Sequence, residues 1–152
     1  MVSITRADFE DPVLARFLQD HLDEMRPTAP PESRHALDLA ELNRPEVRLW
    51  CARLATELVG TVALVRIDTT HEELKSMRTA PQSRGKGVAR AMLRVAVADA
   101  RSRGVRRISL ETGSMDFFAA ARALYLSEGF VSSAPFAQYG PDPNSTFLTL
   151  AL

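Results

Sequence analysis

Hydrophobic residues recur along this chain in alternating helix-like and strand-like patterns. Between Pro12 and Met25 they are spaced as on one face of a helix, and Asp11 is suited to cap its start. Val88 to Arg103 repeats that spacing more regularly, with apolar and charged faces on opposite sides. Other runs alternate polar and apolar residues as strands do. The expected helices cover 12–25, about 32–42, 88–103 and 116–127, and the expected strands cover 2–5, 47–54, 58–67, 71–79, 106–112, 130–131 and 145–152.

The order of these elements predicts an α/β fold with a mixed sheet. The strands 47–54 and 58–67 flank a three-residue turn and should form an antiparallel hairpin. Alternation of strand and helix in the second half implies a right-handed crossover and a parallel strand pair. Helices should cover both faces of the sheet. The segment 132–144 holds three prolines and is expected to be a surface loop.

Composition narrows the possible classes of protein. The 152 residues fit one domain, 1–152, and 45% of them are hydrophobic, which is enough for a full core. Acidic and basic residues balance at 19 each, so duplex nucleic acid is not an expected partner. The single cysteine excludes an internal disulfide, and no residue cluster has the spacing of a metal site. No apolar run has membrane-spanning length and the first residues lack a signal-peptide core, which favours a cytoplasmic protein without membrane partners.

The most specific local feature is a basic, glycine-containing turn that opens directly into a helix. It reads Pro81-Gln-Ser-Arg-Gly-Lys-Gly-Val-Ala-Arg-Ala-Met-Leu93. The first N–H groups of a helix have no partner inside the helix, and together with the helix dipole they attract anions. Glycines at 85 and 87 leave the backbone accessible, and Arg84 and Lys86 add positive charge. The turn is therefore predicted to bind a phosphate or pyrophosphate group.

The two common nucleotide-binding motifs do not fit this turn. A dinucleotide fingerprint requires a third glycine where Arg90 stands, and a P-loop requires Ser or Thr where Gly87 stands. What remains is Gln82-x-x-Gly85-x-Gly87, followed about 40 residues later by Ala121-x-x-Leu124-Tyr125-x-x-x-Gly129-Phe130. This combination, together with the strand Glu73-Leu-Lys-Ser-Met77, resembles the GNAT superfamily of N-acetyltransferases. The runs Ser33-Arg-His-Ala-Leu-Asp38 and Leu110-Glu-Thr-Gly-Ser-Met115, with Pro135-Phe136, also resemble its small, single-domain bacterial members.

The resemblance implies a fold and a co-substrate. It implies a central mixed sheet of about seven strands whose fourth and fifth strands splay apart, with acetyl-CoA bound in that opening. The pantetheine arm would contact the backbone of the fourth strand, and the pyrophosphate would lie on the amides of the turn. The family often has Asn at the position that Phe118 occupies here. The residues expected to bind the cofactor are Met77, Arg78, Thr79, Gln82, Arg84, Gly85, Lys86, Gly87, Val88, Ala89, Phe118 and Ala121.

Acetyl transfer to an amine requires a proton acceptor and a proton donor. A free amine is mostly protonated at pH 7, so a carboxylate should remove its proton. Glu73 on the fourth strand is expected to be this base, with Glu111 on the neighbouring strand as the alternative. Tyr125 occupies the family's tyrosine position and is expected to protonate the leaving thiolate. An exposed strand N–H near Met77 would stabilise the oxyanion.

The acceptor site is less defined by the sequence. His35 and Trp50, with Glu111, are candidates to contact the acceptor, and Arg34 would suit an acidic group on it. The leading hypothesis is an enzyme that acetylates the primary amine of a small molecule or peptide, as a monomer or homodimer. The alternatives are a non-catalytic CoA-binding sensor on the same fold, or an unrelated α/β module that binds another phosphate compound.

Overall fold

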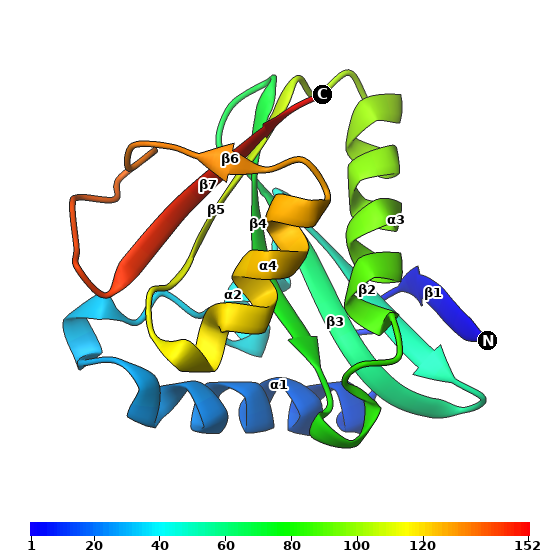
Figure 1. The fold of residues 1–152 in the computed structure, drawn as a ribbon. Helices are drawn as coiled ribbons and strands as arrows, with labels where there is room; N and C mark the ends of the chain where they lie inside the picture. The colour runs from blue at the N-terminus through cyan, green and yellow to red at the C-terminus, as the bar shows by residue number, and fades with distance from the viewer.

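A seven-stranded mixed sheet forms the centre of the molecule, with helices packed on both of its faces (Figure 1). The computed structural model describes all residues from Met1 to Leu152. None of its helices combines the length and apolar character that a membrane span needs. The strands are β1 (Val2–Arg6), β2 (Val47–Leu54), β3 (Glu57–Arg66), β4 (His71–Thr79), β5 (Arg107–Gly113), β6 (Val131–Ser132) and β7 (Ser145–Ala151), and the α-helices are α1 (Pro12–Met25), α2 (Leu39–Leu42), α3 (Val88–Ser102) and α4 (Ala119–Ser127).

The strand order β1-β2-β3-β4-β5-β7-β6 confirms the predicted mixed sheet. Only β4 and β5 are parallel, and α3 provides the crossover between them. Side chains of alternating strand residues point to opposite faces, so each face has its own core. Trp50 and Ala52 pack with α3 and α4, whereas Leu49 and Cys51 pack with α1 and α2.

The parallel pair β4–β5 separates after three residues. The Cα register joins His71–Glu73 to Arg107–Ser109, and no pairing continues beyond it. Figure 1 shows the two strands side by side near the C-terminus of the chain and diverging toward α1, with α4 lying over the opening. The edge of β4 from Leu74 to Thr79 is therefore not paired with β5. This confirms the splayed fourth and fifth strands.

A bulge in β4 lies beside this opening. Ser76 has a φ of +54°, and neither Ser76 nor Met77 has a Cα partner on β3. The Ser76 carbonyl accepts a hydrogen bond of 2.9 Å from Thr61 Oγ1, which holds the bulge. Regular alternation along a strand would place Ser76 and Met77 on opposite faces of the sheet. The bulge breaks that alternation, because an extra residue turns the strand locally.

Two connecting segments lie against each other, and the first of them differs from its predicted structure. The expected helix at 32–42 is reduced to a 3₁₀ turn at Pro31–Ser33 and the short α2, because Asp38 caps a new helix start there. The proline-rich loop 133–144 is tied back to this segment, since Ser33 Oγ donates to Asp142 Oδ2 at 2.6 Å. Residues far apart in the chain thereby close one end of the opening between β4 and β5.

Candidate active site

Two cavities lie along the opening between β4 and β5. The larger, about 460 Å³, lies beside the turn that precedes α3 and is called the turn cleft here. The smaller, about 110 Å³, lies farther between the strands and is called the inner cavity. The two share part of their lining, so they form one continuous site. The shared residues are His21, Met25, Met77, Phe118, Ala121 and Tyr125.

The turn cleft presents a row of free backbone amides. None of the six N–H groups from Gly85 to Arg90 has a hydrogen-bond partner in the protein, and the first intrahelical bond is donated by Ala91 to the Gly87 carbonyl. Gly85 and Gly87 have φ values of +77° and +80°, which glycine adopts without strain. The Arg84 amide is not part of this row, because it donates to the Pro81 carbonyl.

The basic side chains around this turn are mostly neutralised within the protein. Arg84 forms an ion pair with Glu24 of α1 at 2.8 Å and donates from Nε to the Thr79 carbonyl. Arg90 forms an ion pair with Glu128. The attraction for an anion therefore comes chiefly from the backbone amides and the start of α3. This arrangement fits a diphosphate, whose oxygens accept several N–H groups at once.

Buried polar atoms without a protein partner also lie along the splayed edge of β4. They are Arg78 Nε, Thr79 Oγ1 and the hydroxyl of Ser76. Arg78 and Thr79 line the turn cleft, and Ser76 lines the inner cavity. Unpartnered buried polar groups are costly, so a bound molecule with amide and carbonyl groups fits this edge. The residues present thus suit the pantetheine arm and diphosphate of coenzyme A.

Ten of the twelve predicted cofactor residues line the turn cleft. The exceptions are Gln82, whose side chain donates to Glu57 at 3.3 Å, and Lys86, which points to solvent and does not line the cleft. Sequence reasoning missed the contribution of α1. His21, Glu24 and Met25 line the cleft, although they precede the turn by about 60 residues. No local signal marks them, because only the assembled fold brings α1 beneath the opening.

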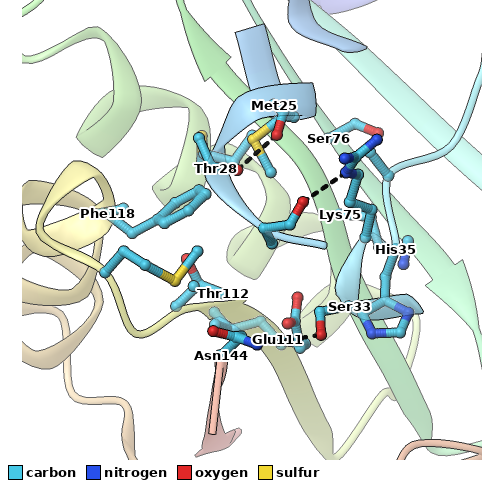
Figure 2. A pocket seen from close by; sticks show the side chains of 18 of the residues that line it. Met25, Thr28, Ser33, His35, Lys75, Ser76, Glu111, Thr112, Phe118 and Asn144 are labelled. Carbon is cyan, nitrogen blue, oxygen red and sulfur yellow. Dashed lines mark hydrogen bonds between the residues drawn. The ribbon is translucent and has the colours of Figure 1, made fainter. Parts of the chain in front are cut away.

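Phe118 forms part of the boundary between the two cavities. Its ring lies so close to Gly113 that a Cβ at position 113 would be 2.1 Å from it. Figure 2 shows Phe118 directed into the space that the inner cavity occupies. The phenyl ring replaces the amide that the family often has here, so this boundary is apolar. Gly113 is needed for the ring to take this position.

Tyr125 stands where the two cavities meet. The residue is only 4% exposed, and burial raises the pKa of its phenol well above the ordinary value. Its hydroxyl has no hydrogen-bond partner in the protein, although it lines both cavities. A phenol in this state remains protonated at neutral pH and can donate to a bound group.

His21 of α1 faces the same junction. It is 7% exposed, and burial together with the charge of Arg78 lowers its pKa to about 4. Its Nδ1 atom is buried without a partner. The imidazole is therefore neutral at pH 7, and it adds no positive charge to the junction.

Glu111 is the carboxylate that lines the inner cavity. Burial raises its pKa above the ordinary value, while a 2.5 Å hydrogen bond from Ser145 Oγ acts in the opposite direction. Figure 2 shows Glu111 across the cavity from Met25 and Thr28, with Asn144 beside it. A carboxylate with a raised pKa is suited to exchange a proton near neutral pH.

Glu73, the base expected from the sequence, is placed differently. It is buried but lines neither cavity. Its Oε2 accepts a 2.5 Å hydrogen bond from the Tyr139 hydroxyl and lies 3.4 Å from Lys75 Nζ. These contacts link β4 to the proline-rich loop, and Lys75 itself lines the inner cavity.

Of the remaining residues expected to contact the acceptor, two line the inner cavity and one does not. His35 and Arg34 line the inner cavity, and the His35 ring meets Tyr139 edge-on at 4.9 Å. Trp50 lines neither cavity. Its buried ring lies against α3 in the core, with the guanidinium groups of Arg6 and Arg48 within 6 Å of its centroid.

Comparison with known proteins agrees with this geometry. A family model described as the acetyltransferase (GNAT) family matches residues 14–130. The chain belongs to this GNAT family. The match covers both cavities except for Asn144. Acetyltransferases of this family use acetyl-CoA, which fits the free amides and the splayed strand described above.

Individual relatives extend the match to nearly the whole chain. The uncharacterized N-acetyltransferase YsnE of Bacillus subtilis is 49% identical over 135 residues, covering 89% of each chain. The uncharacterized N-acetyltransferase YedL of Escherichia coli is 42% identical and covers 100% of this chain and 96% of its own. A crystal structure from Klebsiella pneumoniae, described as a candidate acyl-CoA N-acyltransferase, is 32% identical with a TM-score of 0.83, covering 100% of this chain and 98% of that one. This GNAT protein is an N-acetyltransferase, which sets aside the non-catalytic and unrelated alternatives.

Proposed function

We propose that this GNAT protein transfers the acetyl group of acetyl-CoA to the primary amine of a small molecule by direct attack. The observation that carries this proposal is the meeting of the two cavities at Tyr125. The turn cleft would hold coenzyme A, with its diphosphate on the amides from Gly85 to Arg90. The inner cavity would hold the acceptor, and its volume of about 110 Å³ favours a small molecule over a peptide.

Glu111 is assigned as the base in this proposal. It lines the inner cavity, whereas Glu73 is engaged by Tyr139 and Lys75 away from it. The ammonium form of the acceptor must lose a proton before its nitrogen can attack, and a carboxylate of raised pKa accepts that proton directly or through water. The base expected from sequence, Glu73, is then a residue that positions Lys75 and the proline-rich loop.

The reaction would proceed through a tetrahedral intermediate. The neutral nitrogen forms a bond to the thioester carbon, and the C–S bond breaks as the intermediate collapses. Tyr125 donates its phenolic proton to the departing sulfur, since burial keeps that proton in place at neutral pH. As the intermediate collapses, its nitrogen loses a second proton, which restores the phenol of Tyr125. The products are then the acetamide, free coenzyme A and the one proton that Glu111 took from the ammonium group and passes to water.

A thiol-release assay tests this function. Purified protein is incubated with acetyl-CoA and a panel of small amines, and coenzyme A release is followed against a no-amine control. Amine-dependent release, with the acetylated amine identified by mass spectrometry, is expected. If coenzyme A raises the melting temperature but no amine increases thiol release, the proposed transfer is contradicted.

A further inference from the structure

We infer that the acceptor amine also carries a carboxylate group, and that Arg34 binds it. This inference rests on the proposed function, because it names the class of acceptor for the same site. Arg34 belongs to the segment 34–38 between the 3₁₀ turn and α2, and its side chain lines the inner cavity. Amino acids and similar small aminocarboxylic acids would then be the substrates.

The charged side chains that line the inner cavity differ in whether the protein provides them with a partner. Lys75 lies 3.4 Å from the Glu73 carboxylate and donates to the Tyr139 hydroxyl at 2.9 Å. Glu111 accepts a hydrogen bond from Ser145. Arg34 takes part in none of the ten ion pairs of the protein. It is therefore the cavity's cation without a carboxylate partner.

The guanidinium of Arg34 is fixed by one contact and otherwise available. Its Nε donates to the Ala29 carbonyl at 2.7 Å, while neither terminal nitrogen has a partner in the protein. The remaining N–H groups of a guanidinium can bind both oxygens of a carboxylate in parallel. A partly buried cation gains most from such a partner, because the surrounding protein screens it less than water does.

The arrangement of charges orients such an acceptor. Its amine would lie near Glu111 and the junction at Tyr125, and its carboxylate near Arg34 on the opposing segment. The reverse orientation would set a carboxylate against Glu111. A cavity of about 110 Å³ has room for a small molecule such as an amino acid.

Matched acceptors test this inference directly. The standard L-amino acids are compared with their carboxamides and with the corresponding amines that lack the carboxyl group, at one pH and acetyl-CoA concentration. For at least one set, kcat/KM for the amino acid should exceed that for the carboxamide by about tenfold or more, chiefly through KM.

Variants of Arg34 assign this preference to the guanidinium. In Arg34→Gln the preference for the carboxylate should fall below about threefold, because kcat/KM should fall much more for the amino acid than for the carboxamide. Arg34→Lys should keep part of it, because the charge remains without the planar fork. Arg16→Gln, on the exposed surface of α1, is the matched control and should behave as the wild type. Unchanged melting temperature and coenzyme A affinity would show that the variants fold.

The outcomes separate the two proposals. Turnover of carboxamides or uncharged amines equal to or better than that of the amino acids would overturn the carboxylate inference and leave the acetyl transfer standing. A carboxylate preference that survives Arg34→Gln would overturn the assignment to Arg34. Absence of turnover with every acceptor, despite coenzyme A binding, would overturn both proposals.

Discussion

The turn cleft and the inner cavity share residues at their junction but are built in opposite ways. The turn cleft depends on main-chain groups supplied by one continuous segment, the six free amides from Gly85 to Arg90. The inner cavity depends on side chains from six places in the chain: α1, the segment 28–36, β4, β5 with the turn after it, α4, and Asn144 just before β7. A backbone site is tolerant of side-chain change, whereas a side-chain site can be altered one residue at a time.

This difference explains how one fold can retain a co-substrate while acceptors vary. In the proposed function the turn cleft would hold groups that every coenzyme A molecule carries. The inner cavity is defined by separate residues such as Arg34, Glu111 and Asn144, each on a different segment. Variants that damage the turn cleft and the inner cavity separately test this difference.

The largest effect is expected at Gly87. Gly87→Val should weaken coenzyme A binding by about 1000-fold, because a β-branched residue cannot adopt a φ of +80° without strain and the turn would rearrange. Gly104→Val is a matched control, since Gly104 has a φ of +82°, equally open surroundings and a position at the far end of α3. Calorimetric titration should show lost binding in the first variant alone. Equal loss in both would mean that general strain, not the turn, is responsible.

The next largest effect is expected at Tyr125, where the turn cleft and the inner cavity meet. Tyr125→Phe should lower kcat by about 100-fold, the usual contribution of a general acid, and leave coenzyme A affinity within about twofold. The aromatic packing against Phe130 at 5.7 Å is retained, so stability should change little. Steady-state kinetics with the best acceptor and calorimetry with coenzyme A provide the two readouts. Unchanged kcat would remove Tyr125 as the proton donor.

A comparison of the two carboxylates sharpens the assignment of the base. Glu111→Gln should lower kcat/KM at pH 7 by about tenfold to 100-fold, and the rise in rate should move to higher pH because the acceptor must then lose its proton unaided. Glu73→Gln should leave the position of the pH profile unchanged, even if the loss of the Tyr139 contact alters KM. The opposite result, with only the Glu73 profile moving, would return the base to Glu73.

Replacement of His21 should have the smallest effect on turnover but a measurable effect on stability. Its folded-state pKa of about 4 lies below the unfolded value of 6.5, so the unfolded chain binds more protons between these values. The stabilisation is complete above about pH 6.5 and is lost as the pH falls toward 4.

Across this pH window His21 should account for about 2–3 kcal/mol of the free energy of unfolding. Urea unfolding at pH 7 and pH 4.5 should show this fall in the wild type and a smaller fall in His21→Leu. His35→Leu is the control, since that residue is only partly buried. Equal pH dependence in the wild type and His21→Leu would show that His21 is not buried in its neutral form.

The turn cleft was largely predictable from sequence because its determinants are local. The glycines, the helix start and the preceding strand lie within one short segment. Periodicity identified the helix and the strand, and the glycines were identified in the turn between them. The bulge at Ser76 was not predictable, because a positive φ at a serine is imposed by the neighbouring strand rather than by its own preference. Alternation along β4 therefore did not indicate which of its side chains enter the site.

The residues of the inner cavity were only partly predictable, because their placement depends on contacts with other segments rather than on the local sequence. Motifs and strand positions singled out Tyr125, Glu111 and His35, but they could not show that Glu111 lines the cavity whereas Glu73 does not. Glu73 is engaged by Tyr139, which lies 66 residues away and contacts it only after the sheet assembles. His21 of α1 carries no sequence signal, since its role at the junction follows from where α1 packs.

The most direct test concerns the six free amides and the diphosphate of coenzyme A. Calorimetric titration of the purified protein with coenzyme A, dephospho-coenzyme A and pantetheine compares ligands that differ in the groups facing the turn. We expect the two diphosphate-containing ligands to bind within about tenfold of each other and pantetheine to bind at least about 100-fold more weakly, because only the diphosphate occupies the amides. No heat with coenzyme A, or equal affinity for pantetheine, would contradict the assignment of this turn.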